Sequence, residues 1–103
     1  MNKKTLRHQI LNISVNLARV SEFAMQPQNL REVLISKFLD QTEDYLDEIK
    51  KADISADLQD TLNVFEKDFK ILKKQQINDK NYYQWAEKAL TWANILEHRS
   101  SLV

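Results

Sequence analysis

The chain of 103 residues contains no cysteine, no glycine and a single proline. Without cysteine it has no disulfide framework and no thiolate chemistry, which is compatible with a reducing compartment. Without glycine it lacks the residue best suited to left-handed turns and to close approach of the backbone to a phosphate group. The composition therefore disfavours hairpin-rich β folds and glycine-loop nucleotide sites.

Long apolar runs and a net charge are also missing from the sequence. Apolar residues occur only in short runs, so no segment has the length that is needed to cross a bilayer. Polar residues interrupt the first segment, which argues against a signal peptide. The 15 basic and 15 acidic residues balance, so the chain has no overall charge that would attract nucleic acid. We expect a cytoplasmic protein that binds neither nucleic acid nor a membrane.

The chain does contain an apolar stripe with heptad spacing, and this stripe recurs four times. Steps of three and four residues place each set of apolar residues on one face of a helix. The four sets are Leu6-Ile10-Ile13-Leu17-Val20-Ala24, Leu34-Phe38-Thr42-Tyr45-Ile49, Leu58-Leu62-Phe65-Phe69-Leu72 and Tyr82-Trp85-Ala89-Trp92-Leu96. Four such faces can bury one another, and a chain of this mass buries roughly two-thirds of its unfolded surface. The sequence predicts an all-α four-helix bundle with one domain over residues 1–103.

Turn signals between the stripes predict where the helices begin and end. Pro27 ends the first helix, because proline disfavours helical geometry at the preceding residue. Asn29 and Glu32 form a capping-box-like pair at the start of the second helix, and Asn81 or Asp79 is expected to cap the fourth. The predicted helices cover residues 4–25, 30–51, 57–74 and 82–99. The short connections predict that consecutive helices are antiparallel, in up-down-up-down order.

Two tryptophans on the predicted fourth helix, Trp85 and Trp92, alternate with small alanines. We interpret this stripe mainly as core, because large and small side chains must alternate for facing helices to interdigitate. Each indole N–H then needs a partner, and Thr42 and Ser14 on facing helices are candidates. The alternative interpretation is a helical small-molecule-binding protein or enzyme with a pocket beside the indoles. A cavity on the order of a few hundred Å³ with converging charged groups would favour that alternative.

Acidic residues concentrate between residues 32 and 60, where nine acids face three bases. Carboxylates four residues apart, such as Asp40 and Asp44, could hold a hard cation or face a basic partner. A solvated helix face is the interpretation we favour for them. No set of residues has the pattern of a catalytic, metal or cofactor site. The sequence therefore predicts a protein without enzymatic activity, metal or cofactor.

Val64 and Ile71 form a small apolar strip on the predicted third helix, away from its core stripe. The two residues lie seven apart and roughly 120° from the stripe, at about 100° per residue. Lys67 and Lys74 border them. Packing inside a bundle does not require apolar residues there, so these four residues are the candidate partner-binding site. We expect an interaction or regulatory module that recognises a protein partner or a second copy of itself.

A second apolar strip lies on the predicted first helix. Leu11, Val15, Ala18 and Met25 make its apolar surface broader than one neighbouring helix needs. The strip either widens the contact with flanking helices or forms a patch for self-association or for a partner. The sequence favours the first interpretation without excluding the second.

Overall fold

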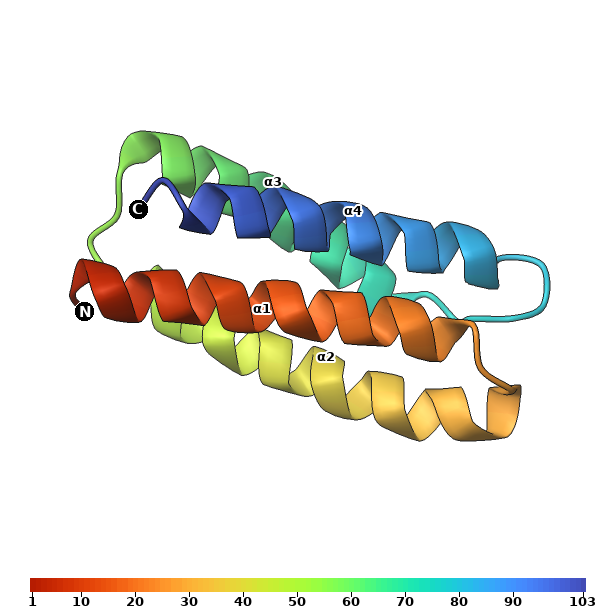
Figure 1. Ribbon diagram of the computed structural model, residues 1–103. Coiled ribbons are helices and arrows are strands. Elements are labelled where there is room, and N and C mark those ends of the chain that lie inside the picture. Colours follow the sequence, from red (N-terminus) through yellow and green to blue (C-terminus); the bar gives the residue numbers. More distant parts are fainter.

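The computed structural model contains four α-helices and no strand in the backbone, which is described for all residues 1–103 (Figure 1). Side chains are described for residues 1–27 and 31–103. The helices are α1 (Lys3–Ala24), α2 (Gln28–Lys50), α3 (Ala56–Lys74) and α4 (Tyr82–Ser100). Each helix runs antiparallel to the one before it (Figure 1). The predicted all-α four-helix bundle is confirmed.

The helix ends agree with the predicted bounds within one or two residues, but the caps differ. At the start of α1 the Asn2 side chain accepts a hydrogen bond from the Thr5 amide at 2.8 Å. α2 begins directly after Pro27, so Asn29 lies inside the helix, and its predicted capping role falls outside the described side chains. Asn81 precedes α4 without capping it; its Oδ1 accepts from the Asn78 amide at 2.8 Å and so fixes the preceding turn.

The core follows the predicted stripes of α1 and α3 at every position. These two sets of buried residues are Leu6, Ile10, Ile13, Leu17, Val20 and Ala24, and Leu58, Leu62, Phe65, Phe69 and Leu72. On α4 the two tryptophans and Ala86, Ala89, Ala93 and Leu96 are buried, while Tyr82 is only half-buried. The phase of the apolar period therefore gives the buried face of three helices.

On α2 the predicted central line is wrong by one residue at three positions. The buried residues are Ile35, Leu39, Thr42, Leu46 and Ile49. Leu34, Phe38 and Tyr45 are half-buried beside them. Apolar residues occupy two adjacent lines of this helix, and the pattern alone does not say which one faces the bundle centre. Phe38 lies on the side toward α1, where its ring centroid is 5.6 Å from that of Phe23.

α1 lies closest to α4 and to α2, and small side chains explain its approach to α4. Ser14 Oγ donates to the Ala93 carbonyl at 2.6 Å, and Ser21 Oγ donates to the Ala86 carbonyl at 2.8 Å. The donors are seven residues apart on α1 and the acceptors seven apart on α4, in the opposite direction. The antiparallel register of this pair is thus marked by two buried hydrogen bonds.

Candidate functional site

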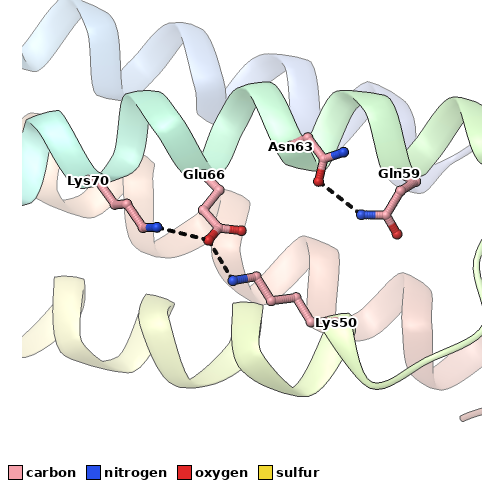
Figure 2. Close-up of polar contacts among 5 residues, drawn as sticks. All are labelled: Lys50, Gln59, Asn63, Glu66 and Lys70. Atoms are coloured by element: carbon pink, nitrogen blue, oxygen red, sulfur yellow. Dashed lines mark hydrogen bonds and ion pairs between the residues drawn. The ribbon is translucent and has the colours of Figure 1, made fainter.

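Ion pairs join α2 to α3 along one side of the bundle. Glu66 of α3 accepts from Lys50 of α2 at 2.6 Å and from Lys70 of its own helix at 3.2 Å (Figure 2). The hydrogen bond from Lys50 is the main cause that holds the pKa of Glu66 below its ordinary value, against the opposing effect of partial burial. Nearby on α3, Gln59 donates to Asn63 at 3.0 Å. Glu66 is therefore a charged link between the two helices at neutral pH.

Lys73 makes a second link between the same helices. Its ammonium group pairs with Glu43 and, at 3.1 Å, with Asp40, both on α2. The hydrogen bond to Glu43 is the leading cause that raises the pKa of Lys73 above its ordinary value. Two acids of the predicted solvated face thus contact α3, and no three ligand-type side chains in the described part of the chain cluster as a metal site would require. We call these contacts of Asp40, Glu43, Lys50, Glu66 and Lys73 the α2–α3 seam.

A cleft of about 440 Å³ opens between α2 and the end of α3. Its apolar lining consists of Ile35, Leu39, Leu72, Ile77 and Trp85. Its charged lining consists of Arg31, Glu32, Asp40, Lys73 and Lys74. We call this cavity the Arg31 cleft. It has the volume and the mixture of apolar and charged groups that the small-molecule interpretation requires beside an indole.

The indole N–H groups bond to α3 and not to the predicted hydroxyl partners. Trp85 Nε1 donates to the Leu72 carbonyl at 3.0 Å, and Trp92 Nε1 donates to Asp68 at 2.9 Å. Thr42 bonds to its own helix, as Ser14 bonds to α4. The predicted hydroxyl partners are wrong because both indole N–H groups face α3, which lies beside α4. Trp92 lies away from the Arg31 cleft, in an open groove with Asp68.

Arg31 is a buried cation with incomplete hydrogen bonding, with 4% of its surface exposed. Its two terminal nitrogens lie 3.5 Å from the carbonyls of Ala24 and Ile77. Among the described side chains its Nε has no hydrogen-bond partner, and no described carboxylate lies within 4.0 Å of the guanidinium. The signal that could have revealed it is spacing, because Arg31 precedes Ile35 and Leu39 at steps of four on the buried line of α2.

The structure places the predicted partner-binding residues on the outer surface of α3. Val64 and Ile71 are 54% and 57% exposed. Lys67 is exposed between them, whereas Lys74 is exposed at the edge of the Arg31 cleft. Lys74 lies about 15 Å along the helix from Val64, at about 1.5 Å per residue. The four residues therefore share one helix surface, but Lys74 also borders a second feature.

The apolar strip of α1 continues onto α4. Leu11 and Ala18 are half-buried, and Ala18 packs against the core, which is what a wider helix contact requires. Val15 is 45% exposed and Met25 is also exposed. Leu90 of α4 is 44% exposed, and the register of the serine–alanine pairs places it at the level of Ala18. We call these five residues the α1–α4 strip.

None of the described helices combines the length and apolar character of a membrane-spanning segment. Comparison of the chain with protein-family models, with curated proteins and with solved structures finds no match.

Proposed function

We propose that this protein is a non-catalytic interaction module that associates with a second copy of itself through the α1–α4 strip. The observation that carries the proposal is the self-complementary outer surface of α1. Exposed apolar residues that are contiguous across two helices are typical of interaction surfaces. A closed homodimer further requires a surface that matches its own two-fold image.

The residues of this surface of α1 are symmetric about a point near Val15. In order along the helix they are Lys4, Arg7, Leu11, Val15, Ala18, Glu22 and Met25. Steps of three and four keep them on one face. When a second copy of α1 lies antiparallel across a two-fold axis near Val15, Arg7 stands opposite Glu22 and Leu11 stands opposite Ala18. The same apolar and charged residues then serve both copies.

The charges on this surface are arranged for such a pairing. Lys4 and Arg7 make the first half of the α1 surface basic, whereas Glu22 makes its second half acidic. Glu87 of α4 is exposed at the level of Glu22, because the adjacent Ala86 pairs with Ser21. Arg7 donates to the Val103 carbonyl at 2.6 Å, which orders its side chain at the surface. The two-fold image therefore sets the basic half of one copy against the acidic half of the other, which favours this register over a parallel one.

The surface is small for a permanent complex. From Lys4 to Met25 the helix is about 33 Å long, and only part of the α4 surface adds to it. Stable complexes bury about 800 Å² per partner. We therefore expect a reversible dimer whose population depends on protein concentration.

Charge reversal tests the pairing. In the two-fold pairing, Glu22→Arg places a basic side chain opposite Arg7 of the second copy, and Arg7→Glu places an acidic side chain opposite Glu22. Each single variant should associate at least tenfold more weakly than the wild type, because like charges then face one another. An equimolar mixture of the two variants should form heterodimers, since one variant has arginine at positions 7 and 22 and the other has glutamate at both. Sedimentation velocity over a concentration series measures the association of the wild type, of each single variant and of the mixture.

The matched control is Asp47→Arg, which reverses an exposed charge on α2 outside the strip and should leave association unchanged. Far-ultraviolet circular dichroism verifies that each variant keeps its helical content. A wild type that stays monomeric at all concentrations contradicts the proposal. Two single variants that associate as the wild type does, or whose mixture fails to associate, contradict it as well.

The strip of Val64 and Ile71 on α3 is the second candidate surface, favoured by the high exposure of both residues. Lys67 and Lys74 would tune its choice of partner. The double variant Val64→Asp/Ile71→Asp should abolish association if this strip is the contact, and should leave it intact if the α1–α4 strip is. We also propose a cytoplasmic location for the module, which the absence of cysteine permits.

A further inference from the structure

We propose that the Arg31 cleft binds a small organic monoanion with an apolar body, such as a monocarboxylate. This inference is independent of self-association, because the cleft lies between α2 and α3 and shares no residue with the α1–α4 strip. Three features carry it: the unpaired buried charge of Arg31, the apolar lining, and the charge balance at the cleft.

Because Arg31 is buried, its positive charge is energetically unfavourable without a counter-ion. Taking an ion out of water is strongly unfavourable unless the ion is paired and hydrogen-bonded. The two carbonyl contacts of Arg31 lie at 3.5 Å, the outer limit for a hydrogen bond. The three residues with undescribed side chains, 28–30, are Gln, Asn and Leu, and none can supply a negative charge. An anionic ligand would supply it.

The contacts of Arg31 also suggest a purely structural role. Ala24 is the last residue of α1, and the last turn of that helix carries no basic side chain. A cation near those carbonyls stabilises the helix end, and the contact with Ile77 joins it to the segment before α4. A helix end carries about half an elementary charge, however, so this role leaves part of the guanidinium charge uncompensated.

The remaining lining sets the class of ligand. Five apolar side chains, together with eight polar or charged ones, line the open cleft of about 440 Å³, a size within the range of roughly 300–1,000 Å³ for small-molecule pockets. Lys73 is already paired with Asp40 and Glu43. The charged side chains that line the cleft are Arg31, Lys73 and Lys74 against Glu32 and Asp40, a net charge of +1. A ligand with a single negative charge on an apolar chain would neutralise this net charge, whereas a dianion such as phosphate would leave an excess negative charge.

The two indoles provide a built-in reporter for the test. The Trp85 N–H bonds to Leu72 in the wall of the cleft, whereas the Trp92 N–H bonds to Asp68 outside it. Decanoate, titrated below its micelle concentration, should shift the Trp85 indole peak saturably in a ¹H–¹⁵N spectrum and leave the Trp92 peak in place. Decanol, which has the same chain without the charge, should bind at least tenfold more weakly. Inorganic phosphate should produce no saturable shift.

Arg31→Met keeps an unbranched apolar stem and removes the charged guanidinium group. This variant should bind decanoate no better than decanol, and its ligand-free melting temperature should be equal to or above that of the wild type. Lys37→Met, on the exposed surface of α2 outside the cleft lining, is the matched control and should bind decanoate as the wild type does. If Arg31→Met does not fold, Lys74→Met at the cleft edge replaces it and should weaken decanoate binding several-fold.

Any of the following results would overturn the inference. Decanoate could fail to bind saturably, or could shift both indole peaks alike as a nonspecific amphiphile does. Arg31→Met could bind decanoate as tightly as the wild type. A lower melting temperature of Arg31→Met, together with no decanoate binding by the wild type, would show that Arg31 only holds the ends of the helices together. None of these results bears on self-association, which the charge reversals on α1 test separately.

Discussion

The α1–α4 pair and the α2–α3 pair of this bundle are held together by different physical means. Between α1 and α4 the buried hydroxyl groups of Ser14 and Ser21 bond to backbone carbonyls of alanines on the facing helix. Between α2 and α3 long charged side chains reach across the gap and pair at the surface (Figure 2). The first pair is therefore closely packed, whereas the second leaves room for the Arg31 cleft.

The difference separates the two proposed activities. A surface that must match its own image needs a rigid support, and the small-residue contact gives α1 and α4 a fixed register. A cleft that admits a ligand must be able to open at its edge. Exposed ion pairs contribute only about 0–1 kcal/mol each, so the pairs between α2 and α3 oppose such opening weakly. The closely packed side of the bundle carries the proposed dimer surface, and the side joined by ion pairs carries the proposed ligand cleft.

The largest expected loss of stability comes from placing a larger side chain in the contact between α1 and α4. Ala93→Leu inserts three carbons where the Ala93 backbone accepts the bond from Ser14. Overpacking of this kind destabilises by about 1–3 kcal/mol, and urea unfolding followed by circular dichroism measures it. The same exchange at exposed Ala56, the first residue of α3, should change the free energy of unfolding by less than about 0.5 kcal/mol. Equal effects at both positions would show that the contact is not closely packed.

Removing a charge from the α2–α3 seam is expected to lower the stability by a smaller amount. Glu66→Gln removes the carboxylate that Lys50 and Lys70 share, and should lower the free energy of unfolding by at most about 1 kcal/mol at pH 7, because Lys50 is partly exposed. The pKa of Glu66 lies below its ordinary value of 4.5 in the folded protein. Its contribution is thus present above pH 4.5 and is lost as the pH falls through the folded-state pKa.

Urea unfolding between pH 7 and pH 2 tests this dependence. The stability difference between the wild type and Glu66→Gln should close as the solution becomes acid. Glu48→Gln, which removes an exposed pair with Lys51 just after the end of α2, should show little difference at any pH. A gap between the wild type and Glu66→Gln that persists at pH 2 would mean that charge pairing is not what Glu66 contributes.

Much of the fold follows from the period of the apolar residues. The stripes of α1 and α3 are single lines, so phase alone identifies the buried face. α2 has apolar residues on two adjacent lines, and only the positions of α1 and α3 decide that Leu39 is deeper than Phe38. Hydrogen-bond partners such as Leu72 for Trp85 depend on which helices become neighbours in space, which periodicity does not encode.

The candidate sites were predictable to different degrees. The exposure of Val64 and Ile71 follows from their angle to the core stripe, and the structure bears that exposure out. Their role in binding stays a prediction. Arg31 could have been noticed because it continues the buried line of Ile35 and Leu39, but a long side chain often bends toward water from such a position. Its burial depends on the cleft that α2 and α3 form together.

Native-state hydrogen exchange tests most directly whether the two sides of the bundle differ in rigidity. We predict that core amides of α1 and α4 exchange only through global unfolding, while amides of α2 and α3 beside the seam exchange through a partial opening that is lower in free energy by about 1 kcal/mol or more. Identical opening free energies in all four helices, or earlier opening of the α1–α4 pair, would contradict it.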